Sequence, residues 1–275
     1  MSNSDIEYIL STKYDNGADY WATPDGKLGV GGPFSTLSAL LILSDLGLDC
    51  NHEAVKGGAN LLIDAIRDDG KIKISKKGSV YPCHMASAAT ALCRNGYGGN
   101  PKVNLMLGYL LNNQHTDGGW RCNKFLYGRG PETEFSNPGV TLAVLDAFRC
   151  IGRNNKIEKL DYGVESLLHH WTIKEPIGPC HYGIGTQFMK VECPLLRYNI
   201  FYFAYVLSFY NKAKDDPRFL QVLDLLNSKL NDEGMVIIER PHLKLSKLES
   251  FKKGQPSVLA TKKYLEILSN LESTI

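Results

Sequence analysis

A repeated order of events along the chain restricts its possible folds more than any other feature of the sequence. An apolar helical run ends at a glycine, a second helical run begins at a proline or another capping residue, and a turn containing glycine follows. The order recurs with a period of about 50 residues, as expected when one pair of helices is repeated. The pattern predicts an all-α protein of about five helix pairs.

The helix pairs are predicted from hydrophobic periodicity together with helix start and stop signals. They cover residues 33–48 with 52–66, 81–98 with 100–114, 138–151 with 157–171, and 194–213 with 216–230, and single helices over 5–11 and 256–271 complete the set. Because the first helix of each pair is the more apolar and the second is amphipathic, we expect an inner ring of helices wrapped by an outer ring. The sequence contains no recognisable linker, so residues 1–275 are predicted to form a single α/α toroid domain.

The connections between these helices differ in length and composition. Those from inner to outer helices are short, whereas those returning from outer to inner helices are long and rich in Gly, Cys, His and aromatic residues. Parallel inner helices place every return connection at the same rim. We therefore expect the loops 69–83, 114–136, 172–194 and 231–254 to share one rim, and we expect the functional site there.

Gln114, Gly118 and Trp120 are spaced as Q-x-x-x-G-x-W at one of the corners between repeats. This spacing resembles the QW-type repeat of the prenyltransferase and squalene cyclase superfamily, whose members are α/α toroids. The resemblance implies that the glutamine braces a helix end and that the tryptophan packs on the neighbouring repeat. One repeat matches the motif in full and the others are degenerate, so the resemblance supports the fold more strongly than an activity.

The same resemblance supplies the leading functional hypothesis. It implies an enzyme, a transferase or cyclase of the terpenoid class, that acts on an isoprenoid or similar apolar substrate in a central, aromatic-lined cavity. The acidic motifs D-x-D-D and D-D-x-x-D of terpenoid enzymes do not occur, because Asp68-Asp69 runs into Gly-Lys and Asp215-Asp216 into Pro-Arg. An alternative hypothesis is therefore a non-catalytic isoprenoid- or peptide-binding module that kept the ring and lost these motifs.

Aromatic residues are concentrated in the predicted helix 194–213. Tyr198, Tyr202 and Tyr205 are expected to fall on one helical face and to point into the toroid. They could bind an apolar chain and stabilise a developing cation, or they could simply fill a narrow ring. Arg197 would lie at the mouth, where it could bind an anionic group of the substrate or pair with a neighbouring carboxylate. These four residues are the candidate substrate-binding residues.

Cys83, Cys122, Cys180 and His181 all fall at the rim predicted to be functional. The segments Trp120-Arg121-Cys122 and Cys180-His181 are similar to the zinc-binding motifs of lanthionine cyclases, although an arginine separates the tryptophan from its cysteine. Zinc requires three or four such ligands in a tetrahedron. We therefore name these four residues as candidate zinc ligands, and a zinc-dependent thiol-chemistry enzyme as a further hypothesis. The alternative is that they are buried thiols without a ligand, and no other cofactor is expected.

Charge and composition exclude several classes of partner. The 31 basic and 29 acidic residues leave a net charge of +2, and no basic run is interleaved with aromatic residues, so nucleic acid is not expected as a partner.

No leader and no apolar stretch of about 20 residues is found, so we expect a cytoplasmic protein without a transmembrane segment. The seven cysteines are then expected to be reduced. His169 and His170, near the end of a predicted outer helix, are expected at the surface. Protein partners are left open.

Overall fold

The computed structural model describes residues 3–75, 77–122 and 131–272. In this part of the chain helices are accompanied only by isolated β-bridges. The α-helices are α1 (Asn3–Ser11), α2 (Thr36–Asp45), α3 (Glu53–Asp64), α4 (Pro82–Arg94), α5 (Pro101–Asn112), α6 (Pro131–Glu134), α7 (Pro138–Cys150), α8 (Glu158–Ile173), α9 (Ile200–Leu207), α10 (Asn211–Lys214), α11 (Pro217–Asn227) and α12 (Val258–Glu272). The short 3-10 helices are η1 (Asp19–Trp21), η2 (Gly32–Phe34), η3 (Leu243–Leu245) and η4 (Glu249–Phe251).

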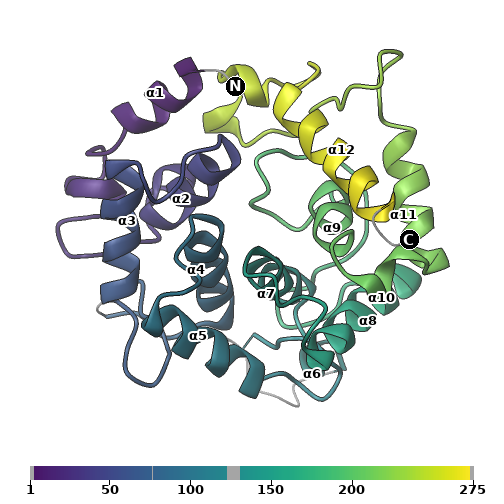
Figure 1. Cartoon of the computed structure of the whole chain (residues 1–275), viewed down its shortest axis with the longest axis horizontal. Coiled ribbons are helices and arrows are strands. Elements are labelled where there is room, and N and C mark those ends of the chain that lie inside the picture. Colours follow the sequence, from purple (N-terminus) through teal and green to yellow (C-terminus); the bar gives the residue numbers. More distant parts are fainter. Residues whose placement is uncertain (1–2, 76, 123–130, 273–275) are drawn as a thin grey trace.

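Alternate α-helices form two concentric layers (Figure 1). The inner helices α2, α4, α7 and α9 surround the centre, and the outer helices α3, α5, α8 and α11 each pack against the inner helix that precedes them. Neighbouring inner helices also pack on one another, from α2 through α4 and α7 to α9. The described chain is therefore an α/α toroid, which confirms the predicted fold class.

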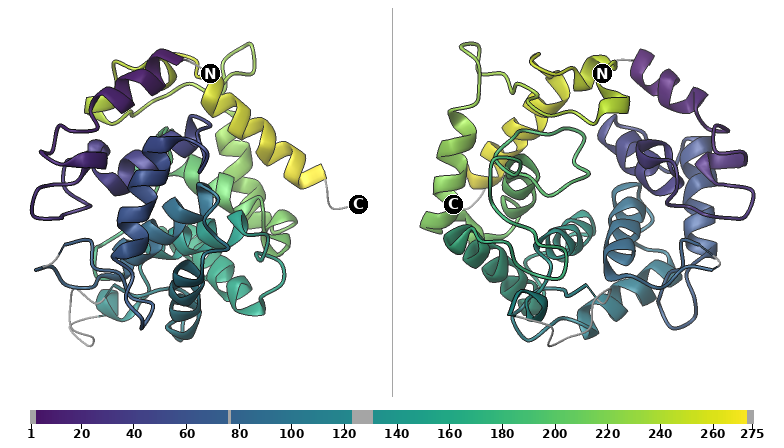
Figure 2. Two further views of the ribbon diagram at one scale, coloured as in Figure 1. Left: turned by 60° about the vertical axis from the view of Figure 1, so that its left-hand side comes forward. Right: turned by 180° about the vertical axis from the view of Figure 1, so that it is seen from behind.

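The two ends of the described chain close the ring. The Asp5 carboxylate of α1 accepts hydrogen bonds of 2.9 Å from the backbone amides of Glu249 and Ser250. Both views of Figure 2 show α1 beside this segment, which precedes α12. Helix α12 packs on α9, and its Lys263 ammonium lies 2.9 Å from the Asp45 carboxylate at the end of α2. These contacts join the first and last repeats.

Local sequence explains where several of the helices begin. Asn100, Asn137 and Asp216 each precede a proline, and their side chains accept hydrogen bonds from amides of the first helical turn. These caps satisfy amides that have no partner within the helix, and proline at the first position sacrifices no hydrogen bond. Helix α2 is capped by Ser35 without a proline. For the three helices that begin at a proline, the sequence signals therefore correspond to real capping contacts, whereas α2 begins three residues after the predicted start at residue 33.

The fourth inner helix is shorter than predicted. Periodicity indicated one helix over residues 194–213, but α9 covers Ile200–Leu207 and α10 is a separate short helix. The Asn199 side chain accepts hydrogen bonds from the amides of Phe201 and Tyr202 and so fixes the start of α9. The preceding apolar residues belong to the return loop. An apolar run cannot by itself distinguish a buried loop from a buried helix, which explains the error.

Apolar side chains of both layers form one continuous core. Inner helix α9 is buried along its whole length, whereas outer helix α11 buries one face. This difference matches the predicted inner and outer rings. No helix in the described residues is long and apolar enough to cross a membrane.

Candidate functional site

A cavity of about 120 Å³ lies in the lumen of the ring, at the rim where α4 and α7 begin. Its walls come from α2, α4, α7, α9 and the loops before α9. The residues that line it are Leu41, Cys83, Ser87, Thr90, Gly139, Val140, Ala143, Tyr182, Leu195, Leu196, Arg197, Tyr198 and Tyr202. Aliphatic and aromatic side chains share this lining with hydroxyl groups, a thiol and a guanidinium group, and the described lining contains no carboxylate. Three of the four candidate substrate-binding residues, Arg197, Tyr198 and Tyr202, therefore share this cavity.

Tyr198 forms part of the cavity wall and is held by a buried histidine. Its hydroxyl lies 2.9 Å from Nδ1 of His170, on the outer helix α8. Nε2 of His170 lies 3.0 Å from the carbonyl oxygen of Glu175, so Nε2 donates to this oxygen and Nδ1 accepts the phenol proton. Burial raises the pKa of Tyr198 and lowers that of His170. Both directions keep the proton on Tyr198, so the pair fixes the orientation of the ring.

Tyr202 and Tyr205 both lie on α9, but their hydroxyls have different partners. Tyr202 lines the cavity, and its hydroxyl donates to Asp146 of α7 at 2.6 Å. Tyr205 donates to Glu266 of α12 at 2.8 Å and lines a separate pocket at the C-terminal ends of the inner helices. The prediction that the three tyrosines share one helical face is therefore wrong, because Tyr198 precedes α9 and Tyr205 does not line the cavity.

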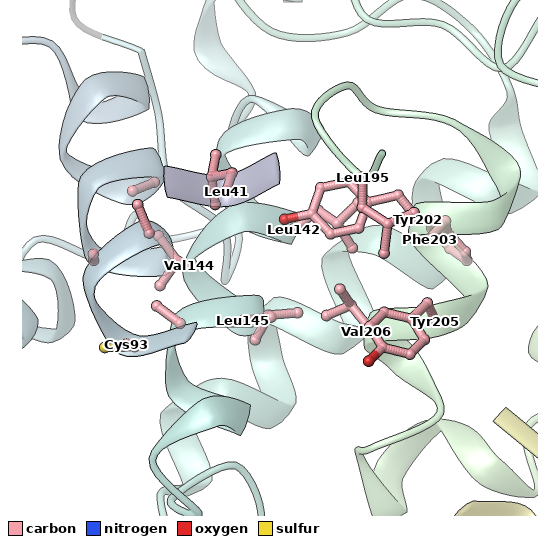
Figure 3. Packing of buried hydrophobic residues seen from close by; sticks show 14 of the residues in the cluster. Leu41, Cys93, Leu142, Val144, Leu145, Leu195, Tyr202, Phe203, Tyr205 and Val206 are labelled. Atoms are coloured by element: carbon pink, nitrogen blue, oxygen red, sulfur yellow. The ribbon is translucent and has the colours of Figure 1, made fainter. Parts of the chain in front are cut away.

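The return loop before α9 enters the ring and narrows its lumen. The Leu195 amide donates to Oδ2 of Asp45, at the end of α2, over a distance of 3.1 Å. The Leu195 side chain is buried in the core, and Figure 3 shows it among labelled side chains of the inner helices, including Leu41 and Leu142. The small volume of the cavity follows from this filling of the ring. The small volume favours the interpretation that most aromatic side chains of the inner ring fill its interior and do not line a ligand cavity.

The predicted common rim brings thiols together. The thiols of Cys83, at the start of α4, and Cys122, in the following return loop, are hydrogen-bonded. The pKa of Cys83 is raised mainly by this hydrogen bond, then by burial, and least by the nearby Cys180 thiol. Cys180 and His181 are exposed. Among the described residues, no group of three or more histidine, cysteine or carboxylate side chains is arranged to hold a metal ion, so the four zinc ligands stay a prediction.

Arg197 lies at the mouth of the cavity and is already paired. Its Nε donates to the Glu192 carboxylate at 2.7 Å, and Arg240 contacts the second oxygen of the same carboxylate at 3.0 Å. Burial raises the pKa of Glu192, although the two arginines oppose this effect. Of the two roles considered for Arg197, the structure therefore shows the pairing with a neighbouring carboxylate.

The corner between α5 and α7 is held by the residues singled out in the sequence. The Trp120 side chain is buried, and its indole N–H donates to the carbonyl oxygen of Leu110 at 2.8 Å. Gln114 donates from Nε2 to the carbonyl oxygen of Lys159 at 2.6 Å and thereby ties the corner to α8. A methyl group on Gly163 of α8 would lie 3.1 Å from the indole ring. The predicted burial of Trp120 against the neighbouring repeat is confirmed.

A buried charge network at the opposite end of the lumen was not predicted. Asp146 of α7 is fully buried, pairs with Arg94 of α4, and accepts a hydrogen bond of 2.7 Å from Nε of Arg149. Arg94 also donates to Asp45 at 3.2 Å. Burial alone would raise the pKa of Asp146, but Arg149 and Arg94 outweigh it and lower this pKa to about 2. An aspartate within an apolar inner helix was the available signal, since a buried charge requires a partner.

Fold and cavity together define an α/α toroid with a small aromatic-lined pocket in its lumen. Solved structures with this architecture include the type II terpene cyclase MstE from Scytonema. A variant of MstE in complex with geranylgeranyl dihydroxybenzoate superposes with a TM-score of 0.51 at 15% identity, over 98% of this chain and 71% of that chain. Apo MstE gives a TM-score of 0.50 at 14% identity, over 98% and 72% of the two chains.

A second substrate complex of MstE also gives a TM-score of 0.50 at 14% identity, over 98% of this chain and 73% of that chain. No protein-family model matches the sequence, and no curated protein matches it. At such low identity the likeness establishes a shared fold and does not establish an activity.

Proposed function

We propose that this protein is a terpene cyclase-like toroid that binds a short isoprenoid, or a similarly small apolar group, in the cavity at its thiol rim. The observation that carries the proposal is the cavity itself, which combines aliphatic and aromatic side chains with hydroxyl groups, a thiol and a guanidinium group. This composition is typical of pockets that bind small organic molecules. The terpene cyclase-like fold supports the isoprenoid class of ligand.

The volume of the cavity limits the size of this ligand. Pockets that enclose a whole drug-sized molecule measure about 300–1,000 Å³, whereas this cavity measures about 120 Å³. An apolar cavity of about 150 Å³ in another protein binds benzene. The cavity is therefore suited to about one five-carbon isoprenoid unit. A longer chain would have to leave its remaining units outside.

Two hydroxyl groups in the cavity indicate that the ligand has a polar end. The hydroxyls of Ser87 and Tyr182 line the cavity and have no hydrogen-bond partner among the described residues. The other two lining phenols differ, because Tyr198 is bonded to His170 and Tyr202 to Asp146. An alcohol or carbonyl group on the ligand would satisfy Ser87 and Tyr182. A short prenyl alcohol has the required shape and chemistry.

A second candidate function, zinc-dependent thiol chemistry, is favoured by the contact between Cys83 and Cys122. Cys83 lines the cavity, and with Cys122 and the nearby Cys180 it could present a thiolate-bound zinc ion to a ligand. His181 would complete the set proposed from the sequence. Zinc binding would require loss of the thiol protons and rearrangement of the exposed Cys180.

A chain-length series tests the ligand class. Calorimetry would compare 3-methyl-2-buten-1-ol, geraniol and farnesol, which contain one, two and three isoprenoid units. Burying five further carbons would gain about 4 kcal/mol, or about a thousandfold in affinity. We expect a gain below about tenfold from the second unit, because the cavity has no space for it. A gain near a thousandfold would contradict the proposed ligand size.

Cavity variants locate the binding site. Ala143→Leu would fill the cavity from α7 and should abolish binding, while Ala143→Ser, which adds one small hydroxyl, should retain it. Ser87→Leu fills the same space from α4 and serves as a second variant if the first is poorly folded. Unchanged binding in both leucine variants would show that the alcohol binds elsewhere.

Elemental analysis tests the second candidate separately. Protein purified without chelator would be compared with Cys122→Ser and with Cys93→Ser, a buried thiol at the other end of α4. Zinc chemistry predicts one zinc per chain in the wild type and in Cys93→Ser, and its loss in Cys122→Ser. Metal-free wild-type protein that still binds prenyl alcohols would reject zinc and leave the ligand proposal intact.

A further inference from the structure

A polar pocket of about 260 Å³ lies at the end of the lumen opposite the thiol rim. It is lined by Ser44, Asp45, Cys93, Arg94, Arg149, Cys150, Tyr205 and Lys263, which come from α2, α4, α7, α9 and α12. From Cys83 to Arg94, α4 rises by about 16 Å at about 1.5 Å per residue. The pocket is therefore separate from the proposed prenyl cavity.

The carboxylate oxygens in this region are already occupied. Both oxygens of Asp146 accept hydrogen bonds in the network described above. Oδ1 of Asp45 accepts from Arg94 at 3.2 Å and lies 2.9 Å from the Lys263 ammonium. Its Oδ2 accepts the Leu195 amide proton at 3.1 Å. The two aspartates therefore present no oxygen that lacks a donor.

The cations, in contrast, retain donors without acceptors. Arg149 uses only Nε, which donates to Asp146, and its terminal nitrogens have no hydrogen-bond acceptor among the described residues. The Lys263 ammonium has one carboxylate partner, Asp45, for its three protons. Both cations line the pocket, with side chains 10% and 12% exposed, whereas the Asp45 side chain is 2% exposed. The pocket thus offers more donors than acceptors.

Stacking fixes the positions of these donors. The Arg149 guanidinium carbon lies 4.7 Å from the ring centre of Tyr205 and 4.5 Å from that of Phe209. The Lys263 ammonium lies 4.6 Å from the same Tyr205 ring. A guanidinium held by stacking and by its Nε bond presents its remaining N–H groups as a rigid fork. Such a fork matches two oxygens of a carboxylate or phosphate group.

Two features of the pocket oppose an anion, and both are limited by their surroundings. The exposed Glu266 carboxylate accepts the Tyr205 hydroxyl proton at 2.8 Å, but Glu266 does not line the pocket. The C-terminal ends of α4 and α7 carry partial negative charge. Backbone amides that follow each helix already donate to carbonyl groups of its last turn. Of the charged groups that line the pocket, the Arg149 and Lys263 side chains are the most exposed, at 10% and 12%.

We infer that this pocket binds a small oxyanion, with the terminal nitrogens of Arg149 and the ammonium of Lys263 as its donors. Phosphate and carboxylate groups share the required chemistry, since both present two oxygens to an arginine fork. The volume of about 260 Å³ accommodates a phosphate ion or a small organic phosphate or carboxylate. The inference does not depend on the ligand of the prenyl cavity.

Titration with inorganic phosphate at constant ionic strength tests the inference. Binding would be measured by calorimetry and by broadening of the ³¹P line. We expect saturable binding to the wild type and at least about tenfold weaker binding to Lys263→Gln. Lys262→Gln is the matched control, because Lys262 is the exposed neighbour on α12 and does not line the pocket. Arg149→Lys keeps the charge but removes the fork, and should also weaken binding.

Competition by acetate identifies the oxyanion. Equal competition would assign the site to carboxylates as well as phosphates, whereas weak competition would assign it to phosphates, and both results support the inference. Absence of saturable phosphate binding to the wild type would overturn it. Equal affinities in Lys263→Gln, Arg149→Lys and Lys262→Gln would also overturn it, because the phosphate would then be bound elsewhere. Melting temperatures without phosphate would verify that each variant is folded.

Discussion

Replacing Asp146 by asparagine should destabilise the toroid more than most single substitutions do. The side chain keeps its shape but loses the charge that balances Arg94 and Arg149. The pKa of Asp146 is about 2 in the folded protein, compared with about 3.9 in an unfolded chain. This difference corresponds to about 2–3 kcal/mol of stabilisation at neutral pH. The cost of leaving the two buried arginines poorly compensated adds to it, so we expect a loss of about 3–5 kcal/mol.

Urea unfolding followed by tryptophan fluorescence would measure this loss. Tyr202→Phe is the comparison, because it removes a single hydrogen bond to Asp146 and leaves both charge pairs in place. It should cost about 1–2 kcal/mol. A loss below about 1 kcal/mol in Asp146→Asn would show that the network contributes no more to stability than an exposed ion pair.

The pH dependence provides an independent test of the same network. Because the folded-state pKa of Asp146 lies below its unfolded-state value, its charge stabilises the fold above a pH of about 4, and this contribution is lost as the pH falls towards about 2. The difference in the free energy of unfolding between wild type and Asp146→Asn should therefore shrink over this range. A difference that is the same at pH 7 and near pH 2 would show that the substitution acts through packing.

Three further predictions concern the corner and the cavity wall. Trp120→Ala should cost about 3–5 kcal/mol in the free energy of unfolding, and a loss under about 1 kcal/mol would mean that the buried indole does not stabilise the corner. Gly118→Ala should lower the free energy of unfolding by about 1–3 kcal/mol, because φ is +87° and the added methyl group would lie 2.5 Å from the Tyr162 carbonyl oxygen. Gly99→Ala is the control, because a methyl group there meets no atom within 4 Å, and it should cost less than about 1 kcal/mol. The lowered pKa of buried His170 means that stability should fall as the pH drops below about 6.5. His170→Asn should show a weaker dependence, to which His84 and His242, whose pKa values burial also lowers, still contribute.

The layered fold could be predicted from the sequence because its signals are local and repeated. Capping residues, prolines and the contrast between apolar and amphipathic helices recur in each pair, and each signal acts within a few residues. The shared rim also followed from topology, and the hydrogen bond between Cys83 and Cys122 confirms that these two loops meet. Whether these thiols bind zinc depends on ligand geometry that spacing in the sequence does not determine.

The interior of the ring could not be predicted in the same way. The amide of Leu195 is bonded to Asp45, which lies far from it in the sequence, and no local pattern specifies such a contact. His170 was expected at the surface because it lies near a helix end, but it is fully buried and bonded to Tyr198. Its environment depends on the return loop that packs over the end of α8. Long-range contacts of this kind set the small size of the cavity and hence the proposed ligand.

A crystal structure of the protein with 3-methyl-2-buten-1-ol would show whether the lumen binds a short prenyl alcohol. We expect one alcohol molecule in the lumen, with its apolar end beside Ala143 and Tyr198 and its hydroxyl within about 3 Å of Ser87 or Tyr182. A lumen that stays without the alcohol at saturating concentration, while the ligand occupies another site such as the outer groove lined by Tyr20, would contradict it.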